Sequence, residues 1–208
     1  MSPEKNFSTE QEDFWAGEFG DDYVDRNAAE QLLISNTALF TQIFRRADPV
    51  SNLIEFGANI GMNLRAMKNL LPTCQLDAVE INPKAAQKLR ESGFVNVFEQ
   101  SILDFEPPQQ YDISFIKGVL IHINPDHLAN VYDKLYEASR QYICVIEYYN
   151  PTPVALPYRG HQDRLFKRDF AGEILDRFND LRLVDYGFIY RRDRFPQDDL
   201  TWFLMEKK

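Results

Sequence analysis

Short apolar runs alternate along the chain with segments of helical periodicity. Runs at 53–56, 75–80, 95–98, 111–116 and 142–148 predict buried strands. Segments at 62–71, 83–91, 124–139 and 170–178 predict helices, and two of these open on an Asn–Pro pair, which supplies an N-cap and a proline at the first helical position. The last two apolar runs, at 181–190 and 200–206, have no helix between them and are expected to pair as a hairpin.

Strands that alternate with helices form a parallel sheet with helices on both faces. The pattern therefore predicts an α/β fold with a mostly parallel seven-stranded sheet and an antiparallel last strand. In such doubly wound sheets the ligand sits at the carboxyl ends of the strands. The residues that directly follow each strand are the candidates for a functional site.

The first 50 residues differ from the rest. The pairs Thr9 and Glu12, and Ser8 and Gln11, have capping-box spacing and predict the start of a short helix. An aromatic and acidic stretch follows, and then a helix over about 28–46. The aromatic side chains of this stretch are too many for a solvated tail and are expected to pack on the protein; they are Phe14, Trp15, Phe19 and Tyr23. We predict a helical cap or lid over 1–50 and a core over 51–208, in one domain overall.

The composition and charge of the chain disfavour several classes of function. The 208 residues carry 23 basic and 32 acidic side chains, a formal charge of −9, so we expect neither nucleic acid nor an anionic membrane as a partner. The polar, acidic beginning is not a secretory signal, and no apolar run approaches the roughly 20 residues that span a bilayer, which predicts a cytoplasmic protein. The two cysteines lie far apart and the three histidines lack metal-site spacing, so we expect reduced thiols and no metal.

A glycine-containing loop, Glu55-Phe-Gly57-Ala-Asn59-Ile-Gly61, follows the first predicted strand. It lacks the three glycines of the dinucleotide fingerprint, and the P-loop pattern is absent. The loop resembles the first motif of class I S-adenosylmethionine-dependent methyltransferases, an acidic residue followed by three glycines at alternate positions. Asn59 replaces the middle glycine, and asparagine tolerates a left-handed backbone better than other non-glycine residues.

This resemblance implies a Rossmann-like class I methyltransferase fold and S-adenosylmethionine as cofactor. Glu80, at the end of the second strand, takes the family's ribose position, and Ser101 with Ile102 take the adenine position. Lys117 and Gly118 line the methionyl end, while Tyr23 or Arg26 of the lid can reach the cofactor carboxylate. The predicted cofactor-binding residues are Glu55, Gly57, Asn59, Gly61, Glu80, Ser101, Ile102, Lys117, Gly118, Tyr23 and Arg26.

Three longer segments are more specific: TEQEDFWAGEFGDDYVDRN, GVLIHINP and EYYNPTPVALPYRGHQDRLFKRDFAGE. They resemble, nearly end to end, a methylase family associated with pseudaminic acid biosynthesis. That resemblance implies a small-molecule acceptor, such as an amino sugar or a sugar nucleotide. It does not identify the acceptor or its reacting atom.

Methyl transfer from a sulfonium needs an aligned nucleophile and, for a hydroxyl or ammonium, removal of a proton. Glu147 interrupts an apolar run where a carboxylate is costly unless it is paired or used. With the residues that follow it, Glu147 suits a cationic acceptor or a sugar; the alternative is an ion pair with Arg159 or Lys167. The catalytic candidates are Glu147, His161 and His122, and the substrate-binding candidates are Trp15, Tyr148, Tyr149, Asn150 and Arg159.

The predicted activity is S-adenosylmethionine-dependent methylation of oxygen or nitrogen in a small polar molecule. An alternative acceptor is a cationic amino or guanidino compound such as an amino acid. A further alternative is a catalytically inactive cofactor-binding subunit, because Asn59 departs from the glycine motif. A nucleic-acid methyltransferase is disfavoured by the charge and by the absence of an N/D-P-P-Y motif. The sequence is compatible with a monomer or a homodimer.

Overall fold

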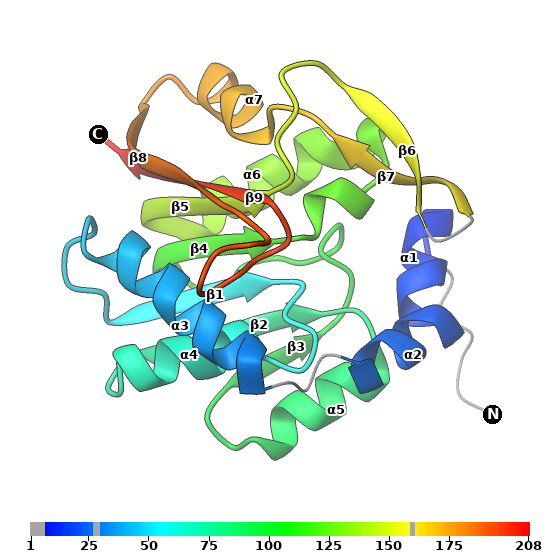
Figure 1. Cartoon of the computed structure of the whole chain (residues 1–208), viewed down its shortest axis with the longest axis horizontal. Coiled ribbons are helices and arrows are strands. Elements are labelled where there is room, and N and C mark those ends of the chain that lie inside the picture. Colours follow the sequence, from blue (N-terminus) through cyan, green and yellow to red (C-terminus); the bar gives the residue numbers. More distant parts are fainter. Residues whose placement is uncertain (1–6, 27–29, 159–160) are drawn as a thin grey trace.

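The computed structural model describes residues 7–26, 30–158 and 161–208, apart from the side chains at 25–26, 157–158 and 161–164. Its centre is a seven-stranded sheet with the order β3-β2-β1-β4-β5-β9-β8 (Figure 1). The strands are β1 Asn52–Phe56, β2 Gln75–Glu80, β3 Asn96–Glu99, β4 Tyr111–Lys117, β5 Ser139–Glu147, β8 Leu181–Ile189 and β9 Leu200–Lys207. Strands β1 to β5 pair in parallel, whereas β9 runs antiparallel to both β5 and β8. The predicted sheet and its terminal hairpin are confirmed.

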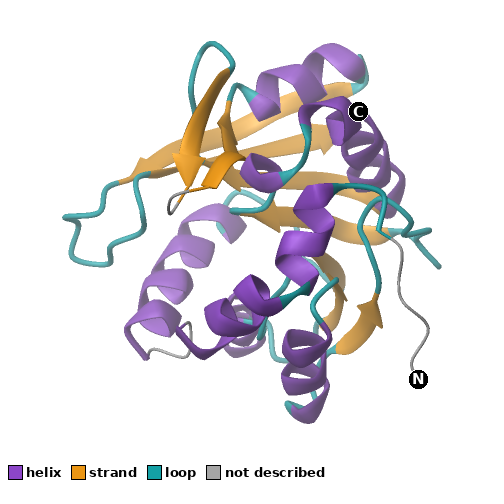
Figure 2. Cartoon of the chain, turned by 90° about the vertical axis from the view of Figure 1, so that its right-hand side faces the viewer, coloured by secondary structure: helices purple, strands orange, loops and turns teal. Residues whose placement is uncertain are grey.

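Helices cover both faces of the sheet, as Figure 2 shows. One face carries α3 Glu30–Phe44, α4 Met62–Leu70 and α5 Pro83–Glu91, and the other carries α6 Leu128–Ala138 and α7 Phe170–Arg177. A 3-10 turn, η1 Leu120–His122, precedes the segment predicted as one helix from 124, and that segment begins as a second 3-10 turn, η2 Pro125–His127, before α6. Asn124 caps the second turn, where its side chain accepts the Asp126 N–H. Two hydrophobic cores result, one on each face.

A second hairpin lies outside the main sheet. Strands β6 Val154–Tyr158 and β7 His161–Lys167 pair antiparallel, with Leu156 opposite Leu165. The apolar runs of the sequence did not predict these two strands. The charged residues and Pro157 of the sequence obscure the alternation there, and Leu165, at 9% exposed, is the one described side chain of the hairpin that belongs to the buried core.

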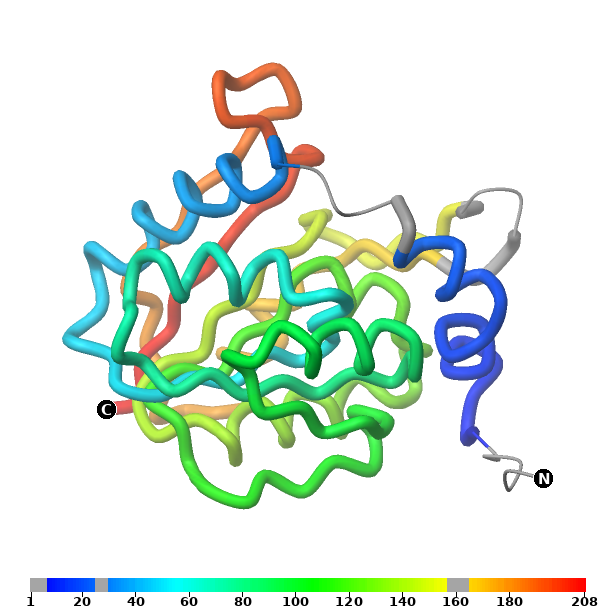
Figure 3. Tube along the Cα trace, turned by 90° about the horizontal axis from the view of Figure 1, so that it is seen from below, coloured from blue at the N-terminus to red at the C-terminus, as the bar shows by residue number. Residues whose placement is uncertain are grey.

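The N-terminal segment forms two short helices, α1 Glu10–Ala16 and α2 Glu18–Arg26. The capping box is confirmed for one predicted pair: Glu12 accepts the Thr9 N–H at 2.9 Å, and Thr9 Oγ1 accepts the Glu12 N–H at 3.2 Å. Figures 1 and 3 place α1 and α2 together at one side of the molecule, beside the β6–β7 hairpin and α5. In contrast, α3 buries Leu39 and Phe40 in the core.

None of the helices in the described ranges is long and apolar enough to cross a membrane.

Candidate functional site

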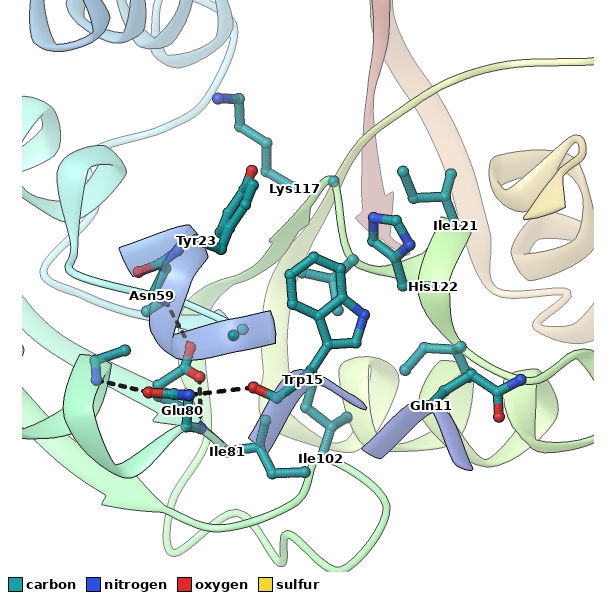
Figure 4. Close-up of a pocket in the computed structure, with 18 of the residues that line it drawn as sticks. Gln11, Trp15, Tyr23, Asn59, Glu80, Ile81, Ile102, Lys117, Ile121 and His122 are labelled. Carbon is teal, nitrogen blue, oxygen red and sulfur yellow. Dashed lines mark hydrogen bonds between the residues drawn. The ribbon is translucent and has the colours of Figure 1, made fainter. Parts of the chain in front are cut away.

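A cavity of about 720 Å³ opens at the carboxyl ends of β1, β2, β4 and β5 (Figure 4). Residues after these strands form its floor, and α1 and α2 form one wall. Its size is typical of a small-molecule site. The position agrees with the rule for doubly wound sheets, from which the candidate residues were chosen.

The loop after β1 has the strained backbone that its glycines suggested. Gly57, Asn59 and Gly61 all have left-handed φ values, of 78°, 50° and 76°. A Cβ on Gly57 would lie 2.6 Å from a Val119 methyl group, and one on Gly61 would lie 2.3 Å from a Leu89 methyl group. Asn59 therefore keeps the turn intact, and its Oδ1 is buried at the cavity without a partner among the described residues.

Substituting Gly61 with alanine is expected to destabilise the protein by roughly 2–4 kcal/mol, because left-handed strain adds to an overpacked contact with Leu89. Gly93 is the matched control. It has a φ of 73°, and an added Cβ would meet nothing within 4 Å, so alanine there should cost only about 1–2 kcal/mol of strain. Denaturant unfolding measures both losses. Equal losses in the two variants would exclude the packing explanation for Gly61.

Glu80 connects the loop to α5. The carboxylate is 6% exposed and lines the cavity; Oε2 accepts the Asn59 N–H at 2.6 Å, and Oε1 accepts the Asn82 N–H at 2.8 Å. Burial raises its pKa, while the backbone donors act in the opposite direction. Each carboxylate oxygen has two lone-pair sites, so both oxygens keep the capacity to accept a further hydroxyl.

Asn82 joins this carboxylate to the N-terminal helices. Its Oδ1 accepts the Ala85 N–H as the N-cap of α5, and its Nδ2 donates to the Trp15 carbonyl at 3.2 Å and to Asp21 Oδ1 at 3.0 Å. The sequence predicted only the cap. The contacts with α1 and α2 were missed, because no sequence signal links residues more than 60 positions apart.

The loop after β3 also contacts α1. The Ser101 hydroxyl donates to Glu12 of the capping box and accepts the Leu103 N–H. Ser101 and Ile102 are 5% and 8% exposed and line the cavity, as their predicted adenine-side position requires. The sequence assigned Glu12 to the capping box alone, so its contact with Ser101 at the cavity was not predicted.

Three rings meet over the cavity. The Trp15 ring centroid lies 5.3 Å from that of Tyr23 and 4.6 Å from that of His122. Figure 4 shows the indole between the other two rings. All three residues line the cavity, which brings two lid candidates next to a candidate base. Arg26 belongs to α2, but its side chain lies outside the described residues.

Glu147 takes a different position from the one expected of a catalytic group. It is 2% exposed and is absent from the described lining; its Oε1 accepts the N–H groups of Val119 and Leu120, both at 2.8 Å. Burial raises its pKa to about 8. The carboxylate therefore holds the start of η1, and the charge that the sequence could not explain has a structural use.

The other acceptor candidates divide into three groups. Tyr148 lines the cavity, donates to Asp198 and lies under Lys167, whose Nζ is 4.7 Å from the ring centroid. Tyr149 and Asn150 do not belong to the described lining; Tyr149 is 44% exposed and Asn150 Nδ2 donates to the Thr152 carbonyl. Arg159 and the side chain of His161 lie outside the described residues, so their predicted roles stay predictions.

Lys117 and Gly118 line the cavity at the end of β4, whereas Glu55 lies beneath it, fully buried. Glu55 Oε1 accepts from Asn63 Nδ2 at 2.6 Å, and burial raises the Glu55 pKa to about 8. Most of the predicted cofactor-binding residues thus line one cavity, Glu55 and Gly61 do not belong to the described lining, and Glu12, Asn63 and Asn82 are added to it.

No family model matches the chain, and no curated protein sequence matches it. Solved structures do. The 1,6-didemethyltoxoflavin-N1-methyltransferase of Burkholderia thailandensis, with bound 1,6-didemethyltoxoflavin and S-adenosylhomocysteine, matches with a TM-score of 0.67 at 14% identity, over 95% of this chain and 87% of that one. The magnesium protoporphyrin IX methyltransferase of Synechocystis PCC 6803, with bound S-adenosylmethionine, gives 0.65 at 13%, over 98% and 100%.

A third match is the N-methyltransferase NodS of Bradyrhizobium japonicum in complex with S-adenosylhomocysteine, with a TM-score of 0.66 at 16% identity, over 89% of this chain and 97% of that one. At such identities the likeness lies in the fold. The strand order, the antiparallel β9 and the position of the cavity agree with it. The chain has the fold of the class I methyltransferases.

Proposed function

We propose that this protein is an S-adenosylmethionine-dependent methyltransferase that acts on oxygen or nitrogen of a small polar molecule. The observation that carries the proposal is Glu80, a buried carboxylate fixed between the strained loop and α5 with its oxygens toward the cavity. The solved structures named above, which hold this cofactor or its demethylated product, support it as neighbours in fold.

The lining fits the cofactor. Glu80 suits ribose hydroxyls, and Asn59 Oδ1 supplies a buried acceptor without a described partner. An added Cβ at Gly118 would meet nothing within 4 Å, so the backbone there is open to close approach. When bound, the cofactor supplies a methyl group activated by positive sulfur. The protein then has to align the acceptor, exclude water and accept a proton.

Trp15, His122 and Tyr148 are proposed for the acceptor half of the site. His122 and Tyr148 both line the cavity, and Figure 4 shows His122 on the far side of Trp15 from Glu80. His122 is our candidate proton acceptor, since a neutral imidazole has a ring nitrogen that can accept a proton. The resemblance to the pseudaminic acid-associated methylases favours an amino sugar or a sugar nucleotide as acceptor. Glu147 accepts the N–H groups of Val119 and Leu120 at the start of η1, so the argument that it recognises a cationic acceptor loses its main support.

Calorimetry with S-adenosylmethionine and S-adenosylhomocysteine tests the cofactor, and mass spectrometry of amino sugars, sugar nucleotides and amino acids incubated with the protein tests the transfer. We expect both cofactor forms to bind and one acceptor to gain a methyl group. Absence of binding by the folded protein would refute the proposal. Binding without transfer to any acceptor would instead favour the inactive cofactor-binding subunit.

We also propose that α1 and α2 act as a lid coupled to the cofactor through Asn82. Asn82→Asp keeps the acceptor that caps α5 but turns a carboxylate toward the Trp15 carbonyl and Asp21. We expect faster amide hydrogen exchange in α1 and α2, because the hydrogen bonds from Asn82 to these helices are lost. Cofactor binding should weaken about tenfold, since a hydrogen bond to a charged group contributes roughly 1.5–3 kcal/mol of free energy.

The double variant Asn82→Asp, Asp21→Asn restores one donor and one acceptor in exchanged positions. It should recover part of both losses. The coupling would be contradicted if the double variant showed the same amide exchange and cofactor affinity as Asn82→Asp alone. It would also be contradicted if Asn82→Asp matched the wild type in both properties.

A further inference from the structure

Lys117 supplies the only lysine or arginine side chain in the described lining of the cavity. Its Nζ donates to Asn36 Oδ1 at 3.1 Å and to Asn63 Oδ1 at 3.3 Å. An ammonium group has three N–H donors, so one donor is left for a ligand. In Figure 4 this side chain rises from the end of β4 beyond Tyr23, on the side of the cavity away from His122.

Two amides hold the ammonium in place from different elements. Asn36, in α3, is fully buried, and its Oδ1 also accepts from Gln197 Nε2 at 2.9 Å in the loop before β9. Asn63, in α4, has its own Nδ2 committed to Glu55. Asn36 Nδ2 is buried without a partner among the described residues, which leaves a second donor beside the ammonium.

The charge of this ammonium lacks a strong counter-charge. Among the described residues, no carboxylate forms an ion pair with Lys117, and the acids that act on its charge are Glu55 and Glu147. Burial disfavours the charged form of both acids and raises the pKa of each to about 8. Burial also lowers the pKa of Lys117 to about 8, and the two acids act in the opposite direction.

We propose that Lys117, presented by Asn36 and Asn63, is the binding site for a ligand carboxylate in this cavity. The proposal rests on the proposed function and deepens it. A carboxylate has two possible sources, the amino-acid end of S-adenosylmethionine and an acidic acceptor. In either case the ammonium and carboxylate form a charge-assisted hydrogen bond in a largely buried site.

The test compares Lys117→Met with the wild type by calorimetry, using S-adenosylmethionine and decarboxylated S-adenosylmethionine. If the cofactor carboxylate is the ligand, the variant should bind S-adenosylmethionine about tenfold or more weakly, while the decarboxylated form binds both proteins alike. If an acceptor carboxylate is the ligand, both cofactor affinities stay unchanged. Wild type saturated with S-adenosylhomocysteine should then bind glucuronate more tightly than glucose, and the variant should lose that preference.

Lys207 provides the matched control. Its Nζ donates to the carbonyls of Tyr136 and Ser139, burial also lowers its pKa, and it lies outside the cavity lining, so Lys207→Met should change none of these affinities. Lys117→Gln replaces Lys117→Met if the latter does not fold. The inference is overturned if Lys117 variants alter neither the cofactor comparison nor the glucuronate preference. Wild type that binds neither cofactor form would instead overturn the proposed function and this inference with it.

Discussion

Replacing Glu80 with alanine is expected to weaken the binding of S-adenosylmethionine by about a hundredfold or more. The variant loses the proposed acceptor of two ribose hydroxyls, and hydrogen bonds to a charged group are worth roughly 1.5–3 kcal/mol each. It also leaves the N–H groups of Asn59 and Asn82 without their acceptor, so the loop and the start of α5 lose a shared support. Calorimetry measures the affinity, and thermal unfolding shows whether the variant is folded at the temperature of the titration.

Asp77 supplies the control for Glu80. It is a second buried carboxylate on β2, at 1% exposed, and it accepts the Tyr111 hydroxyl at 2.6 Å away from the cavity. Asp77→Asn should lower stability and leave cofactor affinity within about twofold, on the scale of a few tenths of a kcal/mol. If Glu80→Ala binds the cofactor as tightly as the wild type, or if Asp77→Asn weakens binding equally, Glu80 is not the anchor.

Local signals in the sequence were sufficient for most of the fold. Each parallel strand is a short apolar run, and Asn82 and Asn124 carry caps that the structure confirms. The β6–β7 hairpin was not predicted, because its strands are held by contact with the rest of the protein: Leu165, at 9% exposed, is the one described side chain of β7 that is buried in the core. A strand stabilised mainly by tertiary packing has weak periodicity of its own.

The sequence predicted the site residues well where a glycine motif fixes the backbone. It was less informative where the role of a residue depends on the face of the sheet to which its side chain points. Glu147 and Lys117 both end a strand next to the cavity. Side chains alternate along β5, so Ile146 joins the core under α3 and α4 while Glu147 points to the opposite face, toward η1. Lys117 points to the α3 and α4 face and lines the cavity. The sequence marked Glu147 as an unusual charge and Lys117 as a cofactor-binding candidate, but only the sheet register shows that their side chains lie on opposite faces.

Replacing Glu147 with glutamine is expected to change how stability depends on pH. The folded-state pKa is raised from 4.5 to about 8, so between these values the folded protein binds a proton that the unfolded chain has released. The free energy of unfolding of the wild type should therefore fall as pH rises through this window, by up to about 1.4 kcal/mol per pH unit from this group. Glutamine does not titrate and can still accept the N–H groups of Val119 and Leu120 through Oε1.

Urea unfolding at several pH values between 5 and 8 measures the two slopes. The Glu147→Gln slope should be shallower, and the variant should be more stable than the wild type above pH 8, where the wild type must keep a charged carboxylate buried. Glu106→Gln is the control, because Glu106 is exposed and pairs with Lys134 away from the cavity; its slope should match the wild type. Parallel slopes for Glu147→Gln and the wild type would show that the buried carboxylate is already ionised. Methyl transfer retained by Glu147→Gln would complete the case that Glu147 positions η1, and with it His122, instead of meeting the acceptor.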